Sequence, residues 1–261
     1  MLAVVSPAKK LDYSPAPEAL PFTRPALSEK TRALAEVTRT LSAADLKGLM
    51  RISDNLAELN HGRFQRFILD ESALTLGEHA KQAALAFSGD TYVGLQASEM
   101  SQDDLQWAQD HLAILSGLYG VLRPLDLIQP YRLEMGTRLQ TSAGKTLYAW
   151  WGTDIAERLK AIVADHDSPV ILNCASNEYF KAIDTQALGV RVITPVFKEI
   201  KDDKARTLGM FAKRARGMMA RYLVTHRLEN PEDLKGFDLG GYSFQSDGSS
   251  ADTWLFTRPQ P

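Results

Sequence analysis

Polar and charged side chains lie at the ends of the apolar runs that read as strands, and in the loops after them. Lysine and arginine together with asparagine and serine suit an anionic ligand, such as a phosphate or a nucleotide. Glu134 or Glu178 could act as a general base if it is shielded from water. Because strand ends often converge in a mixed fold, we expect these residues to share one cleft. They are Ser6, Lys9, Asp12, Ser88, Asp90, Arg123, Tyr131, Arg132, Glu134, Asn173, Ser176, Asn177 and Glu178.

The sequence gives little support for other kinds of reactive site. The five histidines form no H-x-x-x-H pair and have no C-x-x-C partner, so no metal site and no cofactor are predicted. Ser6 and Lys9 match the S-x-x-K motif of penicillin-recognising enzymes, but that serine opens a helix and Ser6 ends a strand. Cys174 lies in an apolar run without a nearby histidine, and we interpret it as a core residue rather than a nucleophile.

Length and composition indicate a globular protein. The chain has 261 residues, of which 44% are hydrophobic and 24% charged, and no apolar run approaches the ~18–20 residues of a membrane span. The first residues lack the pattern of a signal peptide, and the single cysteine fits a reducing cytoplasm. The formal net charge of −2 argues against nucleic-acid binding by bulk charge, but leaves room for a local basic patch.

Residues 115–136 (LSGLYGVLRPLDLIQPYRLEMG) form an apolar run that glycines and prolines interrupt too often for a regular helix or strand. Its backbone groups need partners and its charges are costly to bury alone, so the rest of the chain must wrap around it. We interpret the run as the wall of a functional cleft. The alternative is a structural connector whose arginines bond its own carbonyl groups.

Apolar spacing and breakers predict the elements that position these residues. Strands are expected at residues 2–5, 82–87, 133–139, 169–174 and 190–196, with a C-terminal hairpin at 242–256. Helices are expected at residues 28–41, on both sides of residues 51–54, after Ser101, at 147–164 and at 213–227. The segment with Pro15, Pro17, Pro21 and Pro25 reads as an extended surface loop. The fold class is α+β, a single mixed domain (1–261) with a central sheet wrapped by helices.

Two segments could bind the DNA backbone. Residues 46–57 have the spacing of a degenerate helix-hairpin-helix, with Ser53 and Asp54 where glycines usually stand; ordinary helix packing is the alternative. Residues 213–227 place their cations within an arc of roughly 160° on a helical wheel, and no acidic residue lies between Lys204 and Arg227; a solvated surface face is the alternative. The predicted DNA contacts are Lys47, Arg51, Ser53, Arg63, Arg123, Arg132, Lys213, Arg214, Arg216 and Arg221.

Six blocks of this sequence strongly resemble the YaaA family of peroxide stress resistance proteins. They are residues 6–12, 49–54, 87–95, 115–136, 173–180 and 215–221. The resemblance covers essentially the whole chain, and the block at 115–136 is long and specific.

The resemblance implies a cytoplasmic protein that is induced by hydrogen peroxide, limits free intracellular iron and protects DNA from oxidative damage. It also implies a single domain of the family's own cantaloupe fold, which binds double-stranded or structured DNA through a positively charged cleft and a helix-hairpin-helix. The hairpin corresponds to residues 46–57, without its glycines, and the cleft to Lys9, Arg123, Arg132 and residues 213–221. No enzymatic activity comes with the resemblance.

We therefore predict a DNA-binding stress protein that contacts mainly phosphates, with little sequence specificity and a strong dependence on salt. The alternative is an enzyme that acts on a small phosphorylated or nucleotide-like substrate in the strand-end cleft. Direct iron handling is the poorest of the three hypotheses, because the sequence has no cluster of cysteine and histidine ligands, although sites built from carboxylates alone remain open.

Overall fold

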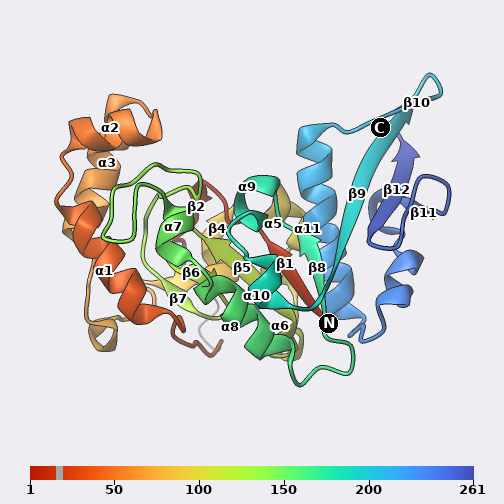
Figure 1. The fold of residues 1–261 in the computed structure, drawn as a ribbon, viewed down its shortest axis with the longest axis horizontal. Coiled ribbons are helices and arrows are strands. Elements are labelled where there is room, and N and C mark those ends of the chain that lie inside the picture. The colour runs from red at the N-terminus through yellow and green to blue at the C-terminus, as the bar shows by residue number, and fades with distance from the viewer. Residues whose placement is uncertain (16–19) are drawn as a thin grey trace.

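An eight-stranded mixed β-sheet forms the centre of the protein (Figure 1). The computed structural model describes residues 1–15 and 20–261. Strand order is β11-β12-β9-β8-β1-β5-β6, and β10 pairs with the outer end of β9. The strands are β1 (Leu2–Val5), β5 (Leu112–Ser116), β6 (Gly120–Leu122), β8 (Val170–Cys174), β9 (Arg191–Lys201), β10 (Lys204–Arg206), β11 (Ser243–Gln245) and β12 (Thr253–Pro259).

The central strands are parallel and buried on both faces. β1 pairs in parallel with β5 and β8, and β8 pairs in parallel with β9. Every residue of β1, β5 and β8 is buried, which explains why their sequences are continuous apolar runs rather than alternating ones. The strands predicted at residues 2–5, 169–174 and 190–196 are confirmed, although β9 continues to Lys201.

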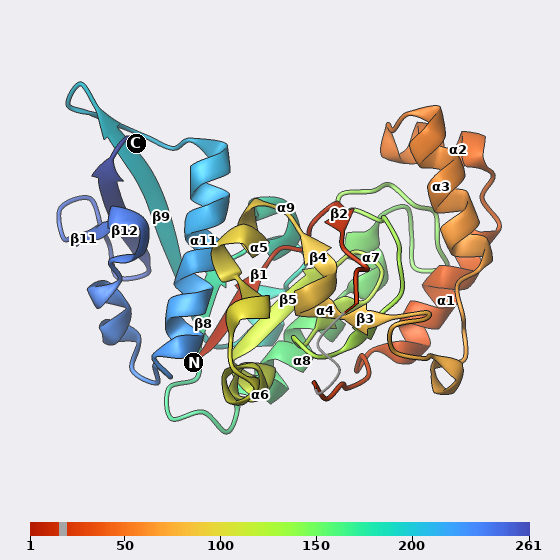
Figure 2. The ribbon, with the colours of Figure 1, turned by 180° about the vertical axis from the view of Figure 1, so that it is seen from behind.

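Helices cover both faces of this sheet. Figure 1 shows α8 and α10 in front of it, and Figure 2, from behind, shows α5 and α6 in front. α11 contacts α5 and α6 and therefore lies on their face. The helices are α1 (Ser28–Arg39), α2 (Ala43–Met50), α3 (Asp54–Gln65), α4 (Ala83–Ala86), α5 (Asp90–Leu95), α6 (Gln102–His111), α7 (Leu147–Trp151), α8 (Asp154–Val163), α9 (Asn177–Phe180), α10 (Thr185–Leu188) and α11 (Gly209–Thr225).

Short elements complete the fold. Two small antiparallel pairs join β2 (Lys10–Leu11) to β4 (Phe87–Ser88), and β3 (Lys81–Gln82) to β7 (Leu127–Ile128). The 3₁₀ helices are η1 (Glu71–Ala73), η2 (Ala97–Glu99), η3 (Pro231–Gly236) and η4 (Leu239–Gly241).

The prediction of a single mixed domain with a central sheet wrapped by helices is confirmed. Within the described ranges, no helix is long and apolar enough to span a membrane.

The α2–α3 pair confirms two helices joined by a tight turn. Ser42 and Asp45 form a capping box at the start of α2, and Ser53 caps α3. Between the helices, Arg51 takes a left-handed conformation (φ 53°), which reverses the chain without a glycine. The pair lies at the end of the molecule opposite β11 and β12 (Figure 1).

Residues 115–136 are mostly buried and wrapped by the rest of the chain, as predicted. The indole of Trp151 donates to the carbonyl oxygen of Gly117 (3.1 Å), and the backbone N–H of Leu125 donates to the Gln109 side chain (2.7 Å). The carboxylate of Asp126 accepts from the backbone N–H of Arg123 (2.7 Å). Side chains from other segments, together with a carboxylate within the run, thus supply the partners that an irregular buried segment needs.

Three predicted elements are wrong or misplaced. Residues 82–87 are not one strand, because the alanine-rich α4 interrupts them. Residues 133–139 contain a turn instead of a strand, in which Thr137 N–H donates to the Glu134 carbonyl (3.0 Å). The helix predicted at 147–164 is broken into α7 and α8 at Gly152, whose φ of 50° no helix accommodates.

The bounds of the predicted basic helix also differ from those in the structure. The basic helix begins at Gly209 and ends at Thr225, so Arg227 (φ 50°) lies beyond it. The C-terminal hairpin is confirmed as the antiparallel pair β11–β12. In the predicted proline-rich loop, residues 16–19, including Pro17, lie outside the described residues.

A stack of three aromatic rings lies beside Met1. The His111 ring stacks on Trp107 (centroids 3.5 Å apart) and on His166 (4.4 Å). The Met1 ammonium donates to Nδ1 of His166 (2.9 Å), and Nδ1–H of His111 donates to the Met1 carbonyl oxygen (3.0 Å). Burial, with the nearby ammonium charge adding to it, lowers the pKa of His166 to about 4 from its usual 6.5.

This depressed pKa makes stability depend on pH. Between pH 6.5 and about 4 the unfolded chain carries a proton on His166 that the folded protein does not, so stability falls as the pH falls through this window. We expect His166→Gln to lose less stability than wild type between pH 6.5 and pH 4 in urea unfolding. The exposed His226→Gln variant should keep the wild-type slope. Equal slopes for His166→Gln and wild type would contradict this prediction.

Candidate functional site

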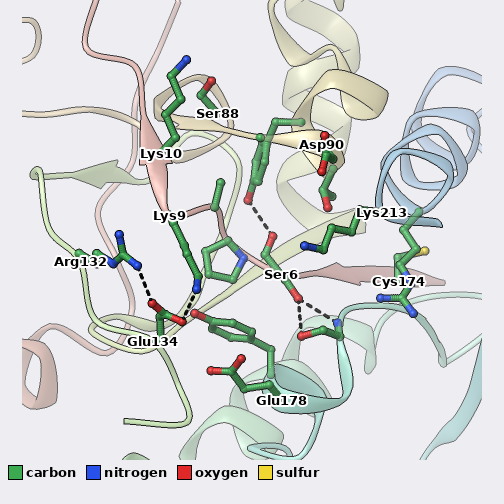
Figure 3. A pocket seen from close by; sticks show the side chains of 18 of the residues that line it. Ser6, Lys9, Lys10, Ser88, Asp90, Arg132, Glu134, Cys174, Glu178 and Lys213 are labelled. Atoms are coloured by element: carbon green, nitrogen blue, oxygen red, sulfur yellow. Dashed lines mark hydrogen bonds and ion pairs between the residues drawn. The ribbon is translucent and has the colours of Figure 1, made fainter. Parts of the chain in front are cut away.

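A pocket opens where β1 and β8 end, with a volume of about 730 Å³ (Figure 3). It is lined by the segments after β1 and β8, by the start of α5, by residues 131–134 and by α11. In the sheet, β1 has β5 on one side and β8 on the other, so the chain reverses its direction of travel across the sheet at β1. Ligands of open α/β sheets commonly bind beyond the carboxyl ends of strands at such a reversal.

Ser6 fastens the two strand ends together. Its hydroxyl oxygen accepts from the backbone N–H of Ser176 (2.9 Å), and its O–H donates to the Ser176 hydroxyl oxygen (3.2 Å). The Ser6 carbonyl oxygen accepts from the hydroxyl of Tyr92 (3.1 Å). Ser6 therefore holds the shape of the pocket floor, and among the described residues no basic side chain forms a hydrogen bond with its hydroxyl.

One side of the pocket is a set of three paired charges, which we call the loop wall: Lys9, Arg132 and Glu134. Lys9 Nζ lies 2.8 Å from one carboxylate oxygen of Glu134, and an Arg132 nitrogen lies 3.1 Å from the other. In Figure 3 both cations point towards this carboxylate. Glu134 thus neutralises part of the positive charge and orders both cationic side chains.

The opposite side, which we call the α11 wall, carries Lys213 and Arg216. In the described part of the chain, neither side chain forms an ion pair or a hydrogen bond. Lys213 is exposed and Arg216 half-buried. Figure 3 shows Lys213 and Glu134 on opposite sides of Ser6. This wall therefore presents positive charge that the protein does not use internally.

A close helix crossing positions the α11 wall. A Cβ atom added to Gly217 would lie 1.8 Å from the Thr91 carbonyl oxygen, and one added to Gly94 would lie 2.0 Å from the Arg214 carbonyl oxygen. The backbones of α5 and α11 are thus in direct contact at two glycines. The same crossing sets Asp90, at the start of α5, into the pocket lining.

Tyrosines form much of the pocket floor. Tyr131 shares a hydrogen bond with Ser116 (2.6 Å), while the Tyr92 hydroxyl is bonded to Ser6. Burial raises the pKa of Tyr92, Tyr131 and Tyr179 well above the usual value. The floor is therefore a neutral surface of fixed aromatic rings at physiological pH.

The remaining acidic and thiol groups differ in their availability. Glu178 accepts from the backbone N–H of Gly136 (2.8 Å), whereas Asp90 has no hydrogen bond or ion pair within the described ranges. Burial raises the pKa of the Cys174 thiol to about 12, so the thiolate is scarce at neutral pH. This agrees with the interpretation of Cys174 as a core residue, although it also touches the pocket. Among the described residues, no group of three or more His, Cys, Asp or Glu side chains could hold a metal ion.

The structure brings most of the predicted cleft residues together. Those that line the pocket are Ser6, Lys9, Ser88, Asp90, Tyr131, Arg132, Glu134, Ser176, Asn177 and Glu178, joined by Lys213 and Arg216. Asp12 instead lines a neighbouring pocket of about 250 Å³. Asn173 is buried beside the pocket, where it donates to Thr194 (3.3 Å) and accepts from the Ala175 N–H (3.1 Å).

The other predicted DNA contacts lie elsewhere or are engaged in contacts. Arg123 pairs with the buried Asp126 (3.4 Å) and does not reach the pocket. Arg221 pairs with Glu99 (3.8 Å), and Arg214 does not line the pocket. Among the described residues, the basic helix therefore has two cations that face the pocket, one (Arg221) in an ion pair, and one (Arg214) whose half-buried side chain forms neither an ion pair nor a hydrogen bond. A helical wheel cannot distinguish these cases.

At the helix pair, Lys47 pairs with Asp54 (2.7 Å), Ser53 serves as the cap of α3, and Arg51 is exposed. Arg63 of α3 is half-buried, bonds Asn60 (3.3 Å), and has its pKa lowered by burial. Figures 1 and 2 place α2 and α3 far from α11, so these contacts would form a separate patch.

Several lining residues were missed in the sequence. Lys10 is exposed, lines the pocket and is unpaired within residues 1–15 and 20–261. Its signal was available, because it follows Lys9 in the polar segment after the strand predicted at residues 2–5. Tyr92 and Tyr179 carried no such signal, because their place in the floor depends on the crossing of α5 and on the end of β8.

Comparison with known proteins gives consistent matches along the whole chain. A family described as "Peroxide stress protein YaaA" matches residues 1–248. A UPF0246 protein of Caulobacter vibrioides (strain NA1000 / CB15N) is 53% identical over 261 residues, covering 100% of both chains. A UPF0246 protein of Maricaulis maris (strain MCS10) is 52% identical over 261 residues, covering 100% of this chain and 97% of its own. A UPF0246 protein of Magnetococcus marinus is 53% identical over 258 residues, covering 99% of each.

Proposed function

The chain belongs to the peroxide stress protein YaaA family, and from this premise we propose that it binds DNA in the cytoplasm during hydrogen peroxide stress and protects it from damage. The DNA surface of this proposal is the basic rim of the pocket, defined as Lys9, Lys10, Arg132, Lys213 and Arg216. The contacts are mainly to phosphates, so sequence preference is weak.

One observation supports this proposal most: the basic rim gathers cations from three separate segments around one opening. The pocket lining has five cations against the three carboxylates Asp90, Glu134 and Glu178, a local excess of two positive charges in a protein whose net charge is −2. Lys10, Lys213 and Arg216 have no internal ionic partner among the described residues. Unpaired cations concentrated on one face attract a polyanion even when the net charge is unfavourable.

The α2–α3 pair is the second part of the proposed DNA surface. Arg51 stands exposed at its turn, while the Lys47–Asp54 pair leaves little net charge there. We therefore assign this pair a supporting contact and the α11 wall the larger electrostatic contribution.

Charge reversal of the α11 wall tests the proposal. We expect Lys213→Glu/Arg216→Glu to weaken binding to labelled duplex DNA at least about tenfold near 150 mM salt, because two phosphate contacts are replaced by repulsion. Fluorescence anisotropy across about 50–300 mM salt should show a steep wild-type slope that flattens by about 1.8 in the variant.

A matched control separates local from global charge. Arg158→Glu/Lys160→Glu changes the net charge equally on α8, which does not line the pocket, and should bind DNA nearly as wild type does. An equal loss in both variants would contradict a local binding surface. Absence of wild-type binding at the lowest salt would refute the DNA proposal.

We extend the proposal to the cell, where the protein lowers free iron and so limits radical damage to DNA. The description of the family as a peroxide stress protein supports a role under these conditions. A gene-deletion strain complemented with wild type or with the α11-wall variant separates the two effects. Spectroscopic measurement of chelatable iron and survival under peroxide would show whether iron lowering requires the DNA surface.

A second candidate function is an enzyme that acts on a small phosphorylated or nucleotide-like substrate. The position of the pocket at the carboxyl ends of β1 and β8 favours it. Saturable binding of a free nucleoside monophosphate, with no duplex binding at the lowest salt, would favour this candidate over the first.

A further inference from the structure

We propose that the pocket receives one unstacked nucleotide, with its phosphate on the α11 wall and its base against the tyrosine floor. This inference rests on the proposed DNA binding and assigns the ligand of the same site. The shared chemistry is a nucleoside monophosphate, whether part of a strand or free.

The size of the pocket limits the size of the ligand that it can hold. A volume of about 730 Å³ falls within the ~300–1,000 Å³ typical of small-molecule sites. Such a cavity accepts a ligand of nucleotide size but not a base pair inside its duplex. A DNA strand that lies along the basic rim can therefore reach the floor only by turning one nucleotide out of its stack.

The distribution of charge indicates where in the pocket a phosphate would bind. Lys213 and Arg216 are not used internally among the described residues, so they are available to an anionic group. On the loop wall, Lys9 and Arg132 are already held by Glu134 at 2.8 and 3.1 Å. A phosphate is therefore best placed at the α11 wall, where charge-assisted hydrogen bonds replace no existing ion pair.

The remaining lining matches the rest of a nucleotide. Asp90 is half-buried without an internal partner within the described ranges, so its carboxylate can accept from a sugar hydroxyl or a base amino group. Pro7, Leu133 and the rings of Tyr131 and Tyr179 offer an apolar floor of the kind on which bases stack. A nucleotide combines an anionic group, hydrogen-bond donors and a flat ring, so it matches this lining better than a simple phosphate does.

A plug at the pocket tests this assignment. Asn177 lines the pocket and is exposed, and its side chain makes no hydrogen bond in the described chain, so Asn177→Trp should fill the opening without disturbing the core. Gln186→Trp is the matched control, because it adds the same side chain to the exposed face of α10 outside the pocket. Two labelled duplexes of equal length are compared, one fully paired and one with a single base opposite an abasic site.

We expect wild type and Gln186→Trp to bind the duplex with the unpaired base at least about tenfold more tightly than the paired duplex, because no base pair must be broken. In Asn177→Trp this ratio should fall to about one. Calorimetry with 2′-deoxyadenosine 5′-monophosphate should show binding to wild type, at least about tenfold weaker binding of deoxyadenosine, which lacks the phosphate, and none to Asn177→Trp.

The outcomes separate this inference from the proposed function. Binding of the free monophosphate without a preference between duplexes supports the pocket assignment and identifies a free nucleotide as its source. Equal affinity for both duplexes and no monophosphate binding overturn the inference, even if paired DNA binds. If wild type does not bind DNA but binds the free monophosphate, the proposed function is refuted, whereas the assignment of a nucleotide to the pocket is supported.

Discussion

Gly217→Ala is expected to destabilise the protein by about 3 kcal/mol, because the α5–α11 crossing leaves no room for a methyl group. The added Cβ would lie 1.8 Å from the Thr91 carbonyl oxygen and 2.8 Å from the Leu95 nitrogen. Both neighbours are backbone atoms, so relief requires the two helices to move apart rather than a side chain to rotate. Urea unfolding should report a lower midpoint with a similar slope.

Gly209→Ala provides the matched control within the same helix. A Cβ at Gly209 has nothing within 4 Å, so this change should be neutral or stabilise the protein by up to about 1 kcal/mol. Equal stability of the two variants would show that the backbones of α5 and α11 are not in contact. Because the crossing also places Lys213 and Arg216, we expect folded Gly217→Ala protein to bind DNA more weakly than Gly209→Ala.

Arg258→Leu is expected to destabilise the protein by about 3–5 kcal/mol, because it leaves Glu199 buried without its cation. These residues are paired neighbours on β12 and β9, and Nε of Arg258 lies 3.6 Å from a Glu199 carboxylate oxygen. The Glu199 carboxylate also accepts from the Tyr242 hydroxyl and from the backbone N–H of Leu208 (3.3 Å), just before α11. The guanidinium lies over the Tyr242 ring, 4.4 Å from its centroid.

A double-mutant cycle distinguishes loss of the pair from loss of packing. Glu199→Leu/Arg258→Leu removes both charges, so its stability should lie closer to wild type than that of Arg258→Leu. Thermal and urea unfolding of the four proteins measure the coupling. A double variant that is as unstable as the sum of the two single variants would contradict a coupled ion pair.

Both predictions concern the parts of the fold that hold α11. Glycines fix the helix against α5 on one side, and the Glu199 network fixes its start against β9 on the other. The α11 wall can remain internally unpaired because other contacts hold the helix in place. A binding surface needs such support, since cations without an internal partner contribute little to stability themselves.

The sequence by itself determined the elements whose signals are local. Continuous apolar runs predicted β1 and β8, and Ser101, which forms a capping box with Asp104, marked the start of α6. Polar residues directly after strand ends predicted Ser6, Lys9 and Ser176 as cleft residues, because parallel strands end at one edge of a sheet. These inferences depend only on neighbours along the chain and on the geometry of sheets.

Tertiary structure alone decided which of the charged residues meet. Arg123 and Arg132 belong to the same predicted cleft wall, but the first is held by the buried Asp126 and only the second faces the pocket. Lys213 and Arg221 share the basic face of one helix, yet Arg221 pairs with Glu99 and donates to the carbonyl oxygen of Gln96, just after α5. Asp12 lies beyond the end of β1 and Asn173 lies within β8, but neither residue lines the pocket. Helical and strand periodicity set the direction of a side chain relative to its own element, whereas its partners depend on packing between segments far apart in the chain.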